Sequence, residues 1–216
     1  TDGMPGALMS EGKVDVVITA ADVISMDGYV ANKVGTYQIA ANGVAQSIWS
    51  LAALAGVAMG PVFITVIGQC MGSGDTEVAD LHFRKLTKIT LLLSSAWNLL
   101  VLLLTPLFMT LYALAPETKR LVVLLVLIHN LFNAIAFPFS GALSNGLRAA
   151  GDVKFTMYVS IASTVLGRLL LSYLLGIVLH MGVIGLAVAM VFDWCIRAVL
   201  FTWRQRTGAW KKFQVV

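Results

Sequence analysis

Three polar side chains interrupt the apolar first half of the stretch from Leu121 to Lys154. They are His129, Asn130 and Asn133. His129 and Asn133 are four residues apart and share one face of a helix, and Asn130 lies about a quarter-turn round. Each group costs on the order of 2–7 kcal/mol if it is left unpaired in hydrocarbon. Because polar groups at membrane depth usually face a bundle interior or a wet cavity, we interpret this stretch as the lining of a membrane transport path.

Amides in two other apolar segments could complete such a path. Asn42 and Gln46 share a helical face at four-residue spacing, and Asn98 offers another amide from a third segment. Amide oxygens and an imidazole can coordinate a cation or bind a cationic compound, and a histidine can carry a proton near neutral pH. Glu11, upstream of the first apolar segment, is either a solvated loop charge or an ion ligand. The alternative is that the buried groups bond one another and only hold the helices together, and the pattern leaves both open.

Three charged residues lie inside the last two apolar segments: Arg168, Asp193 and Arg197. Arg168 and Asp193 are equidistant from a hairpin pivot near His180–Met181, so they should lie at similar depth. Arg197 follows Asp193 by four residues, on the same face. The spacing predicts an Arg168–Asp193–Arg197 cluster. We interpret it as a structural pin rather than a proton relay, because two cations favour the ionised form of Asp193.

The composition indicates an integral membrane protein. Of 216 residues, 58% are hydrophobic and only 12% are charged, whereas soluble domains carry about 45–50% apolar and about 25% charged residues. The net charge of +4 is not gathered in one patch, so it does not predict nucleic-acid binding. Cys70 and Cys195 form neither a disulfide framework nor a metal-binding spacing. With no nucleophile–base pair and no HExxH motif, the sequence predicts no enzyme, no cofactor and no metal site.

The elements that must position these residues are long apolar helices, since a helical span needs about 20 residues. The fold class expected is therefore an all-α integral membrane bundle of six helices, one of them weak. The expected spans are Val14–Met26, Thr36 to about Cys70, about Ile89 to Leu111, the stretch after Leu121, about Met157 to Leu179, and about Val183 to Trp203. The first is weak because it is short and contains Asp15 and Asp22, and one Asp at mid-span costs roughly 2.5–3.5 kcal/mol to insert. Pro61 and Pro138 predict kinks.

The spans divide the chain into an N-terminal loop (1–13), a transmembrane lobe (14–203) and a basic tail (204–216). If the loops are numbered alternately, most of the 15 Lys and Arg residues fall on one side: Lys13, Arg84, Lys85, Lys88, Arg148, Lys154, Arg204, Arg206, Lys211 and Lys212. The other side has Lys33, Lys119 and Arg120. Because cytoplasmic loops carry the excess of positive residues, we expect a multi-pass protein of the cell membrane with both termini in the cytoplasm. If the first span does not cross the bilayer, the N-terminus moves outside.

Three stretches resemble one transporter family. GQCMGSGDTEVA (68–79) is similar to the family's "VGQ-x-x-GAGD" element, and GLRAAGDVKFTMYVS (146–160) is similar to its "LRAAGD-x-[KR]-F" element. VFDWCIRAVLF (191–201) resembles its last helix. Over about Gly35 to Lys212, the chain resembles the C-terminal half of the multidrug and toxic compound extrusion (MATE) family.

The resemblance implies one lobe of a twelve-helix transporter that exports cationic or amphipathic compounds in exchange for H⁺ or Na⁺, by alternating access and without a cofactor. The first lobe is absent from this sequence, so we expect a fragment that is inactive unless it pairs with the missing N-terminal lobe or with itself. Sodium-coupled members use a Glu on the first helix of this lobe and an acidic residue on the fourth. Glu11 matches the first only loosely and the fourth span has no carboxylate, which leaves the ion open.

Two alternatives remain at this point. One is a lipid-linked oligosaccharide flippase of the same superfamily. Such a protein needs several cationic residues lining its cavity, and only Arg168 and Arg197 are available here. The other is a non-transporting membrane fragment.

Overall fold

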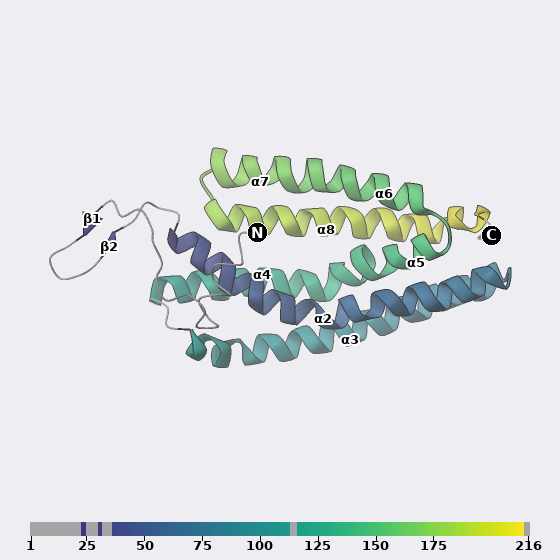
Figure 1. Cartoon of the computed structure of the whole chain (residues 1–216), viewed down its shortest axis with the longest axis horizontal. Coiled ribbons are helices and arrows are strands. Elements are labelled where there is room, and N and C mark those ends of the chain that lie inside the picture. The colour runs from purple at the N-terminus through teal and green to yellow at the C-terminus, as the bar shows by residue number, and fades with distance from the viewer. Residues whose placement is uncertain (1–22, 25–29, 32–35, 113–115, 214–216) are drawn as a thin grey trace.

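The computed structural model describes residues 23–24, 30–31, 36–112 and 116–213. These residues form an elongated bundle whose long helices run along a common axis (Figure 1). The helical elements are α2 (Thr36–Gly72), α3 (Thr76–Leu111), α4 (Pro116–Phe137), α5 (Leu143–Ala149), α6 (Val153–Ala162), α7 (Leu171–Tyr173) and α8 (Gly182–Arg206). Three π-helical segments continue them, η1 (Pro138–Ala142), η2 (Ser163–Leu170) and η3 (Leu174–Val178), and a short 3₁₀ turn, η4 (Ala209–Lys212), follows α8.

Within the described residues, five helices are long and apolar enough to cross a membrane: Ala41–Gly72, Thr76–Leu111, Pro116–Ala149, Val153–Val178 and Gly182–Arg206. Their outward side chains are largely Leu, Val and Ile, which in water would form an unbroken apolar surface. The predicted all-α membrane bundle is confirmed.

The start of the chain adds a small pairing of strands. β1 (Val23–Ile24) pairs antiparallel with β2 (Val30–Ala31), with Val23 opposite Ala31. The predicted loop 1–13 and most of the weak first span, Val14–Met26, lie outside the described residues, and the described part of that span, Val23–Ile24, is a strand rather than the expected helix.

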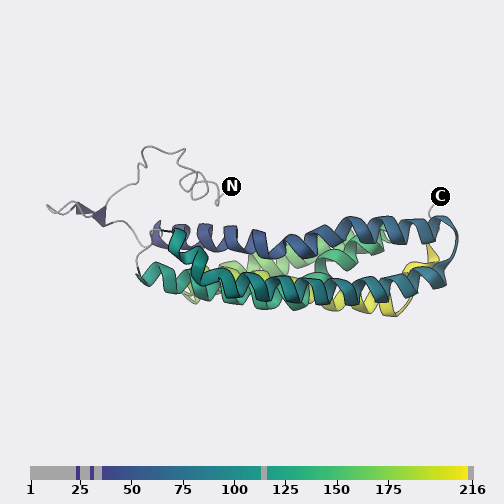
Figure 2. The same ribbon diagram turned by 90° about the horizontal axis from the view of Figure 1, so that it is seen from below.

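Two turns with the same backbone device lie at the end of the bundle that also holds the C-terminus (Figures 1 and 2). After α2, Gly74 adopts a left-handed φ of 78°, and the Asp75 carboxylate accepts a hydrogen bond from Val78 N at 3.0 Å. After α5, Gly151 has a φ of 89°. The glycine-rich stretch 68–75 therefore contains both the end of α2 and the turn at Gly74. We call this the charged end, because it gathers Arg84, Lys85, Lys88, Arg148, Lys154, Arg204, Arg206, Lys211 and Lys212.

The prolines act in three ways. α2 passes through Pro61 and changes direction near its middle (Figure 1), as a missing backbone hydrogen bond predicts. Pro138 marks the change from α4 to the π-helical η1. Pro116 opens α4, because a proline in the first helical turn has no hydrogen bond to lose, so this helix begins before the expected start of the span at Leu121.

Small residues bring α2 close to the helix formed by α4, η1 and α5. A Cβ on Gly56 would lie 2.6 Å from Phe137 Cδ1, and one on Gly60 would lie 2.7 Å from Asn145 Nδ2. Ala52 lies on the same face and is fully buried. The four-residue spacing of these small residues allows the two helices to approach closely.

An aromatic core fills the charged end. Phe63, Phe83, Phe201 and Trp210 are all fully buried there, and the rings of Phe83 and Trp210 are 4.9 Å apart. Part of the predicted tail, 204–216, therefore packs into this core. α8 continues to Arg206, and η4 returns Trp210 to the core, where its indole donates to Gln205 O at 3.1 Å.

Candidate functional site

Two of the predicted amides join three helices near the middle of the bundle. Asn133 Nδ2 on α4 donates to Ala52 O on α2 at 3.2 Å and to Asn98 Oδ1 on α3 at 3.0 Å. Asn98 Nδ2 donates in turn to Ser94 O at 2.8 Å and to Ala52 O at 3.3 Å. Both side chains are buried. This arrangement clamps α2, α3 and α4 together, as the hypothesis of helix-holding amides expects.

His129 and Asn130 lie one turn before Asn133 on α4 and are bonded far less. His129 Nδ1 lies 2.8 Å from Leu125 O, whereas His129 Nε2 has no hydrogen-bond partner among the described residues. Asn130 is 2% exposed, and neither its amide oxygen nor its amide nitrogen has a partner there. A buried group without a partner costs about 1–3 kcal/mol. These two side chains are therefore available to a ligand, an ion or water.

Two tryptophans that the sequence analysis missed enclose the His129 ring. Trp49 on α2 and Trp194 on α8 lie 6.5 Å and 6.3 Å from it, centroid to centroid. The two indoles stack on each other at 5.7 Å, and Trp49 Nε1 has no partner among the described residues. Trp49 follows Gln46 by three residues, so helical spacing on the same face was the signal that could have found it. Aromatic faces beside unpaired amides are the chemistry that attracts cations.

A charged pair lies on α8, where Asp193 directly precedes Trp194 in the chain. Arg197 Nε donates to Asp193 Oδ1 at 2.8 Å and to Ser163 Oγ at 2.7 Å, and Arg197 Nη2 donates to Thr164 Oγ1 at 2.7 Å. Asp193 is 1% exposed, and its Oδ2 has no partner among the described residues. The pair therefore ties α8 to η2 but leaves one carboxylate oxygen unsatisfied.

Arg168 does not join this pair, which corrects the predicted three-residue cluster. Its Nη2 donates to Met190 Sδ at 2.6 Å, and no hydrogen bond or ion pair links it to Asp193 in the described structure. The depth was predicted correctly, but Gly167 is the residue that faces Asp193, since a Cβ there would lie 3.7 Å from Asp193 Cα.

The remaining predicted residues are not joined to the buried polar groups of α4 within the described ranges. Asn42 and Gln46 are half-buried on α2, and no hydrogen bond connects their side chains to the buried amides across residues 36–112 and 116–213. Glu11 lies outside the described residues. In the part of the chain that the structure describes, no group of three His, Cys, Asp or Glu side chains could hold a metal ion.

We call the set Trp49, His129, Asn130, Asp193 and Trp194 the central polar site. Its members come from α2, α4 and α8. Each presents an aromatic face or an unpaired polar atom, which in Asp193 is Oδ2 because Oδ1 is paired with Arg197. The site can offer hydrogen bonds and a π surface to a cation or an amphipathic molecule. No member is positioned as a nucleophile beside a base.

Comparison with known proteins gives one family match. The family model described as MatE matches residues 23–174 of the chain. That range contains α2 to α7 and the whole His129–Asn133 region. No solved structure matches the chain.

The curated proteins that match do so over short stretches only. Methylthioribose-1-phosphate isomerase of Rhodopirellula baltica is 58% identical over 40 residues, which are 18% of this chain and 11% of that protein. The isomerase of Syntrophomonas wolfei is 60% identical over 40 residues, 18% of this chain and 12% of that protein. The chain thus spans about a ninth of the length of these curated relatives, a share too small to carry their activity to it.

Proposed function

This chain belongs to the MatE family, a family of membrane transporters rather than enzymes, and on that premise we propose that it is one lobe of a secondary multidrug antiporter. It exports cationic or amphipathic compounds in exchange for H⁺ or Na⁺. The observation that carries this proposal is the set of unpaired polar atoms on His129 and Asn130, buried among apolar helices. A purely structural bundle has no use for polar groups that bond nothing.

The central polar site suits a cationic, partly apolar compound. Stacked indoles offer a π surface, and the Asn130 oxygen can accept a hydrogen bond from a protonated amine. The free Oδ2 of Asp193 adds negative charge, although Arg197 neutralises much of it. Recognition would therefore depend on aromatic and amide contacts more than on a single strong ion pair.

Transport requires the site to be reached from each side of the membrane in turn. In two-lobed transporters this occurs when one lobe rocks against the other around a mid-membrane site. We propose that this lobe works with a second six-helix lobe, supplied by another chain or by a second copy of this one. The charged end would face the cytoplasm, because positive residues concentrate at that end, and the N-terminus would lie on the same side if the span predicted over 14–26 crosses the bilayer.

The flippase alternative has less support in the geometry. A phosphate-bearing lipid-linked sugar needs free cations inside the lobe. Arg197 is occupied by Asp193, Ser163 and Thr164, which leaves Arg168 as the available guanidinium in the central region of the described chain.

The test is gradient-driven efflux of a fluorescent organic cation from proteoliposomes, with the chain co-reconstituted with an N-terminal six-helix lobe of this family. H⁺ and Na⁺ gradients are imposed separately to identify the coupling ion. We expect His129→Ala and Asn130→Ala each to lower the efflux rate about tenfold, the loss of one hydrogen bond to a charged group. Leu131→Ala, on the lipid-facing side of the same helix, is the matched control and should transport normally. Unchanged efflux in both polar variants would remove this site from the mechanism.

A further inference from the structure

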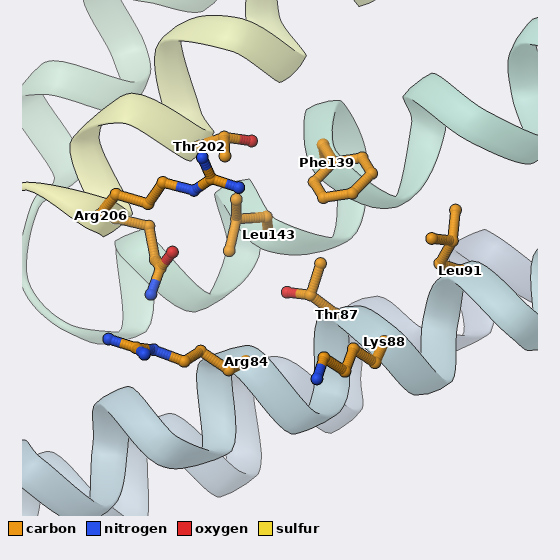
Figure 3. Close-up of a pocket in the computed structure, with 9 residues that line it drawn as sticks. Arg84, Thr87, Lys88, Leu91, Phe139, Leu143, Thr202 and Arg206 are labelled. Carbon is orange, nitrogen blue, oxygen red and sulfur yellow. The ribbon is translucent and has the colours of Figure 1, made fainter.

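A cleft of about 570 Å³ opens between α3 and α8 near the charged end (Figure 3). Arg84 and Lys88, one helical turn apart, line it from α3, and Arg206 extends over it from α8. Phe139 of η1 and Leu143 of α5 form its apolar floor. The cleft is separate from the central polar site, with which it shares no residue.

The charges around this cleft are unbalanced. No acidic residue lines it. Arg84 is paired with Asp80 at 2.8 Å, but Lys88 and Arg206 form no ion pair with any described residue. Two cations on opposite walls repel each other, and the repulsion is relieved when an anion lies between them. Thr202, also on the lining, carries a hydroxyl that donates to no described acceptor and could bond such an anion.

The cleft continues into an apolar hollow. A second depression of about 490 Å³ shares Phe139, Thr202 and Arg206 with the first and extends along Val199 and Trp203. Val199 is 68% exposed and Trp203 is 56% exposed, on a helix apolar enough to cross a membrane. The cationic cleft and the apolar depression beside it together fit a molecule with an anionic head and a hydrocarbon tail.

We propose that this cleft is a binding site for an anionic phospholipid, whose phosphate lies between Lys88 and Arg206 and whose acyl chain runs along Phe139 and Val199. Basic pockets between membrane helices recognise anionic headgroups in this way. A cationic compound of the proposed transported class would be repelled here, and a free phosphate would leave the apolar groove uncovered. This inference requires only that the chain lies in a membrane, and it holds whether or not the proposed transport activity is correct.

The experiment measures lipid binding to the purified full chain in neutral detergent. Native mass spectrometry and thermal unfolding are recorded while dioleoyl phosphatidylglycerol is added, with dioleoyl phosphatidylcholine as the lipid control. We expect phosphatidylglycerol to bind more tightly, and the double variant Lys88→Gln/Arg206→Gln to weaken its binding about tenfold or more. Lys211→Gln/Lys212→Gln removes the same charge at the same end but outside the cleft, and should bind like the parent.

Three results would overturn the site. Equal weakening in the Lys211→Gln/Lys212→Gln variant would show general charge attraction. Equal binding of phosphatidylcholine would show that the headgroup charge is not recognised. Stabilisation by inorganic phosphate or glycerol phosphate as large as that by the lipid would identify a free-anion site. The conservative variant Lys88→Arg/Arg206→Lys keeps both charges and should retain binding, which separates loss of the site from loss of folding.

Discussion

The charged end and the middle of the bundle treat their buried polar groups differently. At the charged end, Asp152 is 1% exposed and accepts hydrogen bonds from Arg204 Nε at 2.6 Å and from Arg204 Nη2 at 3.3 Å. Gln205 donates to Asp80 at 2.9 Å and accepts from the Trp210 indole. Every one of these groups has a partner on another element or turn.

In the middle, burial is just as complete, and Asn98 and Asn133 are bonded, but other buried groups lack partners. Asn130, His129 Nε2 and Asp193 Oδ2 are enclosed without a hydrogen bond to any described residue. The contrast teaches that burial alone does not distinguish structural from functional polar groups. Groups at the charged end connect helix termini, where backbone ends also need partners. In mid-helix the backbone satisfies itself, so an unpaired side chain there is retained for another purpose.

The largest effect should come from breaking the Asp152–Arg204 pair. Arg204→Ala leaves the buried Asp152 carboxylate without its partner and removes the guanidinium that lies 4.6 Å above the Phe155 ring. Removing one member of a buried pair costs about 3–5 kcal/mol, and we expect a loss near the lower figure because Arg204 is 21% exposed. Thermal unfolding in detergent, followed by tryptophan fluorescence, measures the change.

The matched control is Arg84→Gln. This arginine pairs with Asp80 at nearly the same distance, but its side chain is 69% exposed. Exposed pairs contribute about 0–1 kcal/mol, so this variant should unfold close to the parent. Similar losses in the two variants would contradict the view that the Asp152 pair locks the charged end.

A smaller effect is expected from the packing of the same end. Gly146→Ala would place a Cβ 2.5 Å from Phe83 Cε1 and 2.9 Å from Phe63 Cδ1, in a core where both rings are fully buried. We expect a loss of about 1–3 kcal/mol in the free energy of unfolding. Gly43→Ala has no heavy atom within 4 Å of the new Cβ and should be neutral or stabilising by up to about 1 kcal/mol. Equal stability of the two variants would show that the aromatic core is loosely packed.

The helices, one of the turns and the interior position of two polar residues could be predicted from the sequence, because each depends on residues close together in the chain. Long apolar segments fix the helices, and the Gly74–Asp75 turn follows from local chemistry that a short motif contains. The interior position of His129 and Asn133 follows from their cost in lipid. Each of these rests on information within a few residues of the chain.

What could not be predicted depends on rotation about helix axes and on distant partners. Asp152 is the N-cap residue of α6, yet its carboxylate caps no backbone group and instead bonds Arg204, 52 residues later. Arg168 was placed at the right depth, but the π-helical η2 turns Gly167 rather than Arg168 toward Asp193. Spacing gives depth and face only for a regular α-helix, and π-helical turns change the phase.

The finest test separates two neighbouring amides on α4. Asn133→Leu removes hydrogen bonds to Ala52 O and Asn98 Oδ1, which should cost about 0.5–1.5 kcal/mol. Asn130→Leu has the same shape change but removes an amide that bonds no described residue, so we expect no loss of stability and possible gain, together with loss of efflux. Thermal unfolding and efflux are measured on both variants. If Asn130→Leu unfolds as easily as Asn133→Leu and transports normally, Asn130 is a structural amide, and the middle of the bundle is held by the same means as its charged end.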